Sequence, residues 1–127
     1  MNFKTIAYWA IIIFLAAIFV MGGVGKLTQM EVWQDRFVNQ WNLPAWLAPI
    51  TGVAEILGGL MLLIPRLTTL GATAIVMVMI GATGTHIMAG EWPRIGVTLV
   101  FGTMAAIVVK WSLLRAKAAG GAGASED

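Results

Sequence analysis

Residues 52–65 read GVAEILGGLMLLIP, an apolar run that carries one carboxylic acid, Glu55. No Asp, Glu, Lys or Arg lies within nine positions before Glu55 or within ten positions after it. An ionised carboxylate deep in a membrane costs at least about 2.5–3.5 kcal/mol on insertion scales. Such a group is usually neutralised, paired or hydrated, so Glu55 is the sharpest functional signal in the chain.

The composition around this run is that of a membrane protein. Of the 127 residues, 59% are hydrophobic and only 11% are charged, against roughly 25% charged residues in soluble domains. So much apolar surface has to face a lipid bilayer. The small net charge of +2 forms no basic patch for nucleic acid.

Two residue counts exclude whole classes of chemistry. The chain has no cysteine, which excludes disulfides, thiol redox chemistry, iron–sulfur clusters and thiolate metal sites. Its single histidine, His86, excludes a multi-histidine metal site within one chain. We therefore expect no metal site.

Four apolar stretches predict transmembrane helices over residues 5–25, 46–64, 67–88 and 95–114. Each is close to the length of about 20 residues that crosses the hydrocarbon core. We interpret the first as a retained span, because it is longer than a signal-peptide core and no small-x-small cleavage site follows it. The predicted fold is an all-α integral membrane four-helix bundle over residues 1–117, with a disordered tail over residues 118–127.

Residues 28–41 predict a short amphipathic helix between the first and second spans. Thr28 and Glu31 have the spacing of a capping box, which indicates a helix start. Aromatic residues recur every four positions on one face, at Trp33, Phe37 and Trp41. The segment is either a connector lying flat at the membrane interface or a lid over a cavity. We favour the connector, because an interface alone explains amphipathicity.

Lysine and arginine predict the orientation. Four spans place both termini on one side, together with Lys4, Arg66, Lys110, Arg115 and Lys117. The opposite side holds Lys26, Arg36 and Arg94. The positive-inside rule then predicts cytoplasmic termini, and we expect the protein in a bacterial inner membrane.

Glu55 is expected to face the inside of the bundle. Gly52 and Gly59 lie three and four positions from it, so all three residues share one helix face. Small residues mark the faces on which membrane helices pack together, which turns Glu55 away from lipid. Gly52 and Gly59 are therefore candidate ligand-binding residues beside Glu55.

Two further ionisable residues are expected to approach Glu55 from the outer side. His86 lies near the outer end of the third span, close to Thr83, and Lys26 follows the first span. Glu55 is about ten residues deep, or roughly 15 Å of helical rise. Lys26 reaches it if the neighbouring glycines let the first helix bend. We expect an outward-opening pocket with Glu55 as its floor, Lys26 and His86 nearer its rim, and Thr83 on its wall.

Purely structural roles stay open for Glu55 and His86. Glu55 could hydrogen-bond hydroxyl or backbone groups and only fix the helix register. His86 could be a hydrogen-bonding residue at the membrane interface.

Three segments resemble the DoxX and DoxX-like membrane proteins. GGVGKL at 22–27 is similar to the element that closes their first span, GVAEILGGL at 52–60 to their second span, and MIGATGTH at 79–86 to the third span of the DoxX-like branch. The resemblance covers residues 5–115. It implies a four-helix membrane protein with Lys26 and Glu55 at the characteristic polar positions of the family. The family takes its name from a subunit of a thiosulfate:quinone oxidoreductase, so a quinone role is an analogy at the level of the fold.

Three functions follow as hypotheses. The first is an accessory subunit of a membrane redox system that binds a quinone or another lipophilic molecule around Glu55. The chain has no electron carrier, so this role needs a partner subunit or a diffusible reductant. The second is a non-enzymatic assembly or chaperone-like protein. The third is a small proton-coupled exporter with Glu55 as its proton-exchanging group. Whether the protein is an enzyme stays open.

Overall fold

The computed structural model describes the backbone of residues 2–126 and the side chains of residues 2–120. Over these residues the chain is almost entirely helical and contains no strand. The main helices are α1 (Phe3–Thr28), α3 (Leu47–Leu62), α4 (Thr68–Ala89) and α5 (Trp92–Glu126). Between them lie α2 (Met30–Asp35), the π-helical η1 (Arg36–Gln40) and the short 3-10 helix η2 (Pro65–Leu67).

The protein is an all-α membrane helical bundle. Within the described chain, three helical segments are long and apolar enough to cross a membrane: α1, Pro65–Ala89 and Trp92–Gly120. The shorter α3 has 16 residues, or about 24 Å at the usual rise per residue. Pro65 sets its end, since the residue before a proline disfavours helix, and Ile64 is extended with ψ 112°. Four membrane crossings with the predicted boundaries stay a prediction.

Glycines bring the helices of the bundle into backbone contact. A Cβ atom on Gly23 of α1 would collide with the Gly52 carbonyl oxygen and with Ile56. A Cβ on Gly71 of α4 would lie only 2.7 Å from the Gly58 carbonyl oxygen. Lipid supplies no hydrophobic drive for helix association, so this close packing holds α3 between α1 and α4.

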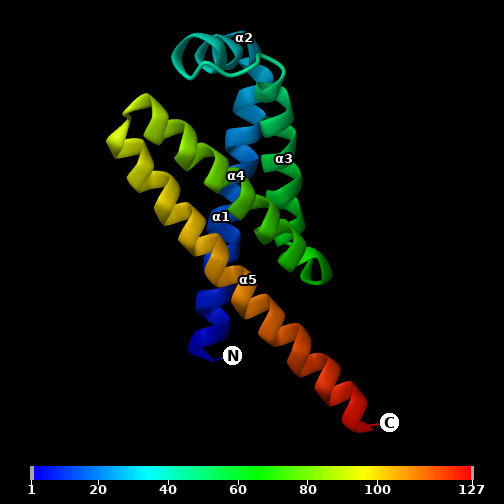
Figure 1. The fold of residues 1–127 in the computed structure, drawn as a ribbon. Helices are drawn as coiled ribbons and strands as arrows, with labels where there is room; N and C mark the ends of the chain where they lie inside the picture. The colour runs from blue at the N-terminus through cyan, green and yellow to red at the C-terminus, as the bar shows by residue number, and fades with distance from the viewer. Residues whose placement is uncertain (1, 127) are drawn as a thin grey trace.

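The buried core fills the half of the bundle near the two chain ends that Figure 1 marks. It includes Ile12 and Leu15 of α1, Ile75 of α4 and Val108 of α5, all at most 1% exposed. From this core, α4 and α5 run together and diverge from α1 and α3 toward the other end (Figure 1). A cavity lined by residues of α1, α3, α4 and α5 lies in this second half of the bundle.

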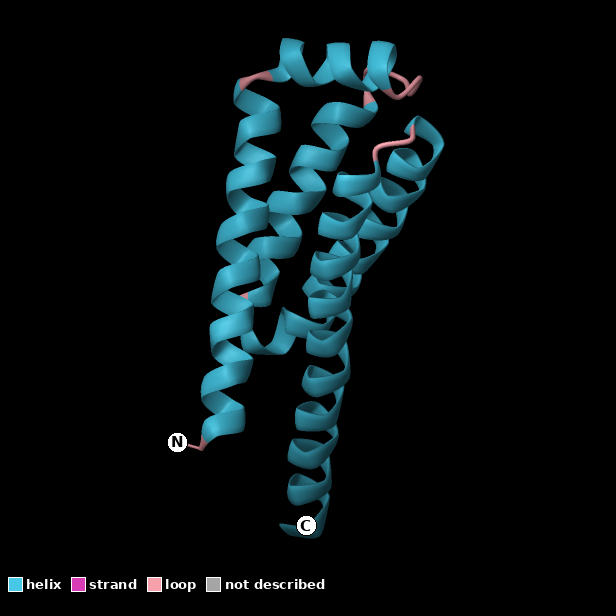
Figure 2. Cartoon of the chain, turned by 90° about the vertical axis from the view of Figure 1, so that its left-hand side faces the viewer, coloured by secondary structure: helices cyan, strands magenta, loops and turns pink. Residues whose placement is uncertain are grey.

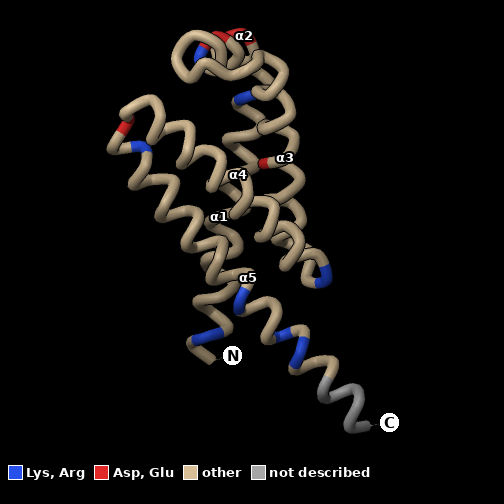
Figure 3. The backbone as a smooth tube through the Cα atoms, viewed as in Figure 1, with Lys and Arg blue, Asp and Glu red and all other residues tan. Residues whose placement is uncertain are grey.

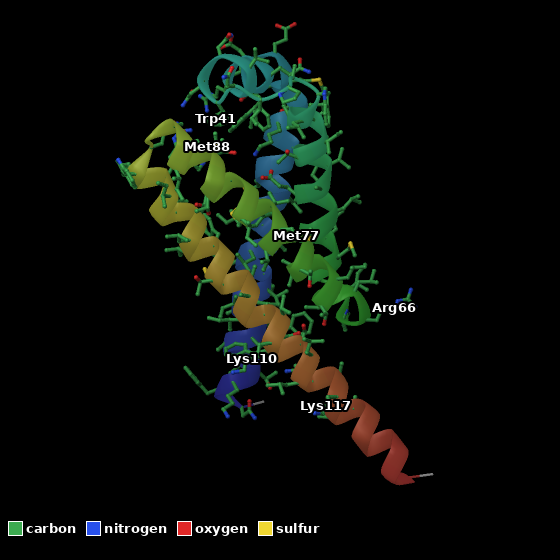
Figure 4. The ribbon with its side chains drawn as sticks, in the orientation of Figure 1. Trp41, Arg66, Met77, Met88, Lys110 and Lys117 are labelled. Atoms are coloured by element: carbon green, nitrogen blue, oxygen red, sulfur yellow. The ribbon has the colours of Figure 1, made fainter. Side chains whose placement is uncertain are left out.

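The segment of α2 and η1 crosses this second half. Figure 2 shows it running across the top of α1 and α3 and reaching the end of the α4–α5 hairpin. We call residues 30–41 the lid, this end of the molecule the lid end, and the opposite end the termini end. Figure 4 places Trp41 and Met88 at the lid end, and Arg66, Lys110 and Lys117 toward the termini end.

Charge is distributed unevenly between the two ends. Among the residues coloured in Figure 3, the acids lie at the lid end and halfway along α3, and toward the termini end only Lys and Arg appear. This distribution is the one from which the sequence predicts cytoplasmic termini. The orientation in a membrane stays a prediction.

One local feature differs from the sequence-based expectations. Thr28 does not start a helix: it is the last residue of α1, and its hydroxyl donates to the Val24 carbonyl oxygen at 2.8 Å. The hydroxyl therefore bonds the preceding turn of α1 and does not cap the start of α2. At the other end, α5 is drawn to Glu126, and the disordered tail that the sequence predicts over residues 118–127 stays a prediction. Asp127 lies outside the described residues.

Candidate ligand site around Glu55

An ion pair between α1 and α3 lies at the centre of the candidate site. The Lys26 ammonium nitrogen is 3.2 Å from Oε1 and 3.0 Å from Oε2 of Glu55. The two side chains are 13% and 7% exposed. A carboxylate this buried inside an apolar bundle is tolerated because a cation contacts both of its oxygens.

The glycines of α1 permit this pair within one continuous helix. α1 stays helical through Gly22, Gly23 and Gly25, so no break in the helix delivers Lys26. Instead, the missing side chains let α3 approach. A Cβ on Gly22 would lie 3.4 Å from Oε2 of Glu55, and Gly23 lies against the backbone of α3.

The lid supplies an aromatic roof above the ion pair. The Trp33 ring centroid is 4.4 Å from the Lys26 ammonium nitrogen, a cation–π distance. Phe37 and Trp41 pack edge to face, with 5.2 Å between centroids. All three rings line the cavity below. The segment therefore covers the cavity, and its position at the membrane interface stays a prediction.

A left-handed turn at the end of the lid directs the chain back into the bundle. Asn42 has φ 59°, a conformation that asparagine tolerates better than most residues. The Leu43 amide then donates to the Phe37 carbonyl oxygen at 2.7 Å. This turn fixes Trp41 at the lid end of the cavity.

The cavity itself has a volume of about 550 Å³ and is lined by α1, the lid, α3, α4 and α5. This volume lies within the usual range of small-molecule sites, about 300–1,000 Å³. Most of the lining is apolar. The polar groups are Lys26, Thr51, Glu55, Thr85, His86, Arg94 and Thr98.

The structure brings together three of the six predicted site residues. Lys26, Glu55 and His86 all line the cavity. Gly52 and Gly59 do not line it. They are buried against α1, where a Cβ would meet Lys26 Cβ at 3.1 Å and Val20 at 2.9 Å, respectively.

Thr83 also lies outside this cavity. Its hydroxyl donates to the Thr98 hydroxyl at 2.8 Å, across the α4–α5 contact. Thr83 lines a separate groove of about 440 Å³ between α4 and α5. Thr83 and His86 are only three positions apart on α4, but Thr83 faces the groove beside α5, whereas His86 faces the Glu55 cavity.

Glu91, in the turn between α4 and α5, is the residue that the sequence analysis missed. Its Oε1 accepts from Trp41 Nε1 at 2.6 Å and lies 2.9 Å from His86 Nδ1. Its Oε2 accepts from Gln40 Nε2 at 2.5 Å and lies 3.6 Å from Arg94 Nε. We call Gln40, Trp41, His86, Glu91 and Arg94 the clasp, because they tie the lid to the α4–α5 hairpin.

The clasp requires an ionised carboxylate, and its geometry favours one. The hydrogen bond with His86 is the main cause that holds the pKa of Glu91 below its ordinary value. Burial, the second-largest effect, opposes it, and the bonds from Trp41 and Gln40 and the charge of Arg94 lower the pKa further. Glu91 is therefore an anion at neutral pH, and it can accept all of these bonds at once.

No sequence signal could have identified this cluster in full. His86 and Glu91 are five positions apart on either side of Gly90, which has φ 72° and ends α4. Their proximity could therefore have been predicted from the local sequence. The lid residues of the clasp are about fifty positions away in the chain, and only the fold brings them there.

Comparison with known proteins gives a family but no characterised relative. No curated protein and no solved structure matches the chain. The model of the DoxX-like family matches residues 10–108, which cover most of α1, the lid, α3, α4 and about the first half of α5, and the chain belongs to that family.

Proposed function

We propose that the cavity binds a lipophilic molecule with a carbonyl head group, most simply a quinone, and that the protein is an accessory subunit of a membrane redox system. The observation that carries this proposal is the Lys26–Glu55 pair, which faces a mostly apolar cavity beneath an aromatic roof.

The ion pair supports a ligand that accepts a hydrogen bond. A lysine ammonium has three N–H donors, and two of them serve the oxygens of Glu55. One donor is left for a ligand oxygen. Because the ammonium is shielded from water, a bond from it to a carbonyl is worth about 1.5–3 kcal/mol, like other bonds from charged groups.

The roof supports a planar head group. Trp33, Phe37 and Trp41 present ring surfaces to the cavity, and aromatic rings pack favourably on flat conjugated molecules. A quinone combines a flat ring, two carbonyl acceptors and low polarity, which match the three features of the site. The protein would receive or pass on electrons through a partner subunit, since its own residues include no electron carrier.

The exporter hypothesis has less support. Proton-coupled transport needs a carboxylate that releases and regains its proton, and a cation of the same chain already pairs with both oxygens of Glu55. The assembly hypothesis keeps one specific observation, the groove between α4 and α5 that Thr83 lines. A partner helix there would leave the Glu55 cavity untouched, so binding experiments on the cavity separate the two roles.

The test is the binding of decylubiquinone to the protein in lipid nanodiscs, followed by quenching of tryptophan fluorescence. We expect saturable binding, because Trp33 and Trp41 line the cavity. The double variant Lys26→Met/Glu55→Leu removes both buried charges together, which spares the fold. It should bind at least about tenfold more weakly, the value of one lost charge-assisted bond.

The matched control is Lys110→Met, which removes an exposed lysine outside the cavity. It should bind like the wild type. A wild-type protein that does not bind the quinone, or a double variant with unchanged affinity, would overturn the proposed function.

A further inference from the structure

We infer that the ligand reaches the cavity sideways from the bilayer, through an opening between α3 and α4, while the clasp keeps the lid closed. This inference rests on the proposed function, because it assumes that a ligand occupies the cavity. It also narrows the ligand class to molecules dissolved in the membrane, with a polar head at Lys26 and an apolar tail that extends into lipid.

The lid is fastened at both of its ends. At its start, the Trp33 ring centroid lies 4.4 Å from the ammonium nitrogen of Lys26 in α1. At its end, Trp41 donates to Glu91 and packs edge to face on His86, with 5.5 Å between centroids. Displacing the lid breaks both sets of contacts at once, so this face of the cavity is the more firmly closed one.

By contrast, exposed residues line the cavity on the side between α3 and α4, as Ile18 of α1 and Val97 of α5 do elsewhere in it. Met77 and Gly81 of α4 line the cavity and are also exposed on the outside of the bundle, Met77 by 67%. A Cβ on Gly81 would meet nothing within 4 Å. Across from them, Leu47 and Thr51 of α3 line the same cavity. We call these four residues the side opening.

The side opening is confined to the lid-end half. Toward the termini end, α3 and α4 are in backbone contact at Gly58 and Gly71, and Ile75 is 1% exposed. From there the two helices diverge (Figure 1). Because α3 and α4 are in contact toward the termini end and separate toward the lid end, lipid can reach the cavity between these two helices only at the side opening.

The residues at the opening fit an apolar tail. Met77 is a flexible apolar side chain that adapts its shape to what packs against it, Leu47 is apolar, and Gly81 leaves room. A charged or strongly hydrated solute would have to lose its water in the bilayer before it reached Lys26, which costs several kcal/mol. The route therefore selects for molecules that already partition into the membrane.

The absence of cysteine from the chain makes a direct test simple. In the variant Gln40→Cys/Glu91→Cys, the two thiols replace side chains whose polar atoms are 2.5 Å apart. A short bis-maleimide then tethers the lid to the α4–α5 hairpin. We expect decylubiquinone to bind the tethered protein in nanodiscs at a rate within about twofold of the untethered double variant. Binding that is lost on tethering would overturn access from the side.

The complementary test obstructs the side opening. Gly81→Trp adds a large side chain where there is space for it and should slow decylubiquinone binding at least tenfold. The matched control is Gly96→Trp in α5, where a Cβ also meets nothing within 4 Å but which does not line the cavity. Unchanged binding in Gly81→Trp would contradict the inference.

These outcomes separate the inference from the proposal on which it rests. If the wild type does not bind the quinone, the proposed function fails and the inference with it. If the wild type binds but the tether blocks binding, only access from the side is wrong.

Discussion

The two halves of the bundle are held together by different interactions. In the termini-end half, apolar side chains interdigitate around Ile12, Leu15 and Val108, and Gly58 and Gly71 bring backbones into contact. In the lid-end half, α4 and α5 diverge from α1 and α3 (Figure 1), and two polar clusters add to the packing there: the Lys26–Glu55 pair between α1 and α3, and the clasp between the lid and the α4–α5 hairpin. The termini-end half is densely packed, whereas the lid-end half contains the polar clusters and the cavity.

This difference explains where ligand chemistry is expected. A half that is filled by side chains has no room for a ligand, and α1, α3 and α4 approach too closely there to admit one. Polar contacts fix a few points and leave the space between them free. Variants that remove the polar contacts of one half, or that disturb the close packing of the other, therefore test this difference.

The largest effect is expected from the ion pair. Lys26→Met leaves the Glu55 carboxylate buried without its cation, which costs about 3–5 kcal/mol when one partner of a buried pair is removed. We expect a correspondingly large drop in the thermal unfolding temperature in detergent.

The compensating variant is Lys26→Met/Glu55→Leu, which removes both charges and should recover most of the lost stability. If Lys26→Met alone unfolds at the wild-type temperature, the pair does not organise the lid-end half.

A second, smaller effect compares two glycines of the same helix. A Cβ on Gly71, in the packed half, would lie 2.7 Å from the Gly58 carbonyl oxygen and 2.8 Å from Met61 Cβ. Gly71→Ala should therefore destabilise the protein by about 1–3 kcal/mol, as overpacking does.

Gly81, in the open half, is the matched control, because its Cβ would meet nothing within 4 Å. Gly81→Ala should leave the unfolding temperature unchanged or raise it slightly, since alanine favours helix by about 0.5–1 kcal/mol over glycine. Equal destabilisation by both variants would show that the two halves are packed alike.

The smallest effect concerns the lid and pH. Because the pKa of Glu91 is lowered in the folded protein, its stabilisation of the clasp is complete above the ordinary value of 4.5 and is lost as the pH falls through the lowered value. Acrylamide quenching of tryptophan fluorescence should rise over this acidic range, as Trp41 is released from Glu91.

In Glu91→Gln the side chain does not titrate, so the quenching step should be absent and the quenching higher already at neutral pH. A wild-type profile that matches the variant at every pH would contradict the clasp.

The sequence predicted the fold and the proximity of Lys26 to Glu55 because both depend on strong local signals. Apolar stretches of membrane length predicted the main helices, and an isolated acid on a small-residue face predicted that Glu55 points inward. Lys26 and His86 were expected near it from their depth along the spans. The DoxX-like resemblance was confirmed over residues 10–108.

What the sequence did not predict depends on how helices diverge and on contacts between distant segments. Gly52 and Gly59 share the helix face of Glu55, but that face is wide enough for the glycines to contact α1 while the acid faces the cavity. Thr83 is turned to α5 by its bond with Thr98. The clasp joins the lid to a turn about fifty residues later, which no periodicity indicates.

The most direct measurement of the central claim is the infrared carbonyl absorption of bound decylubiquinone labelled with ¹³C at its carbonyl carbons. The account predicts that one carbonyl band shifts to lower frequency in the wild-type protein, because it accepts a hydrogen bond from the Lys26 ammonium. The shift should disappear in Lys26→Met/Glu55→Leu and persist in Lys110→Met. A band at the same frequency in the wild type and the double variant would contradict the claim that the Lys26–Glu55 pair forms the ligand site.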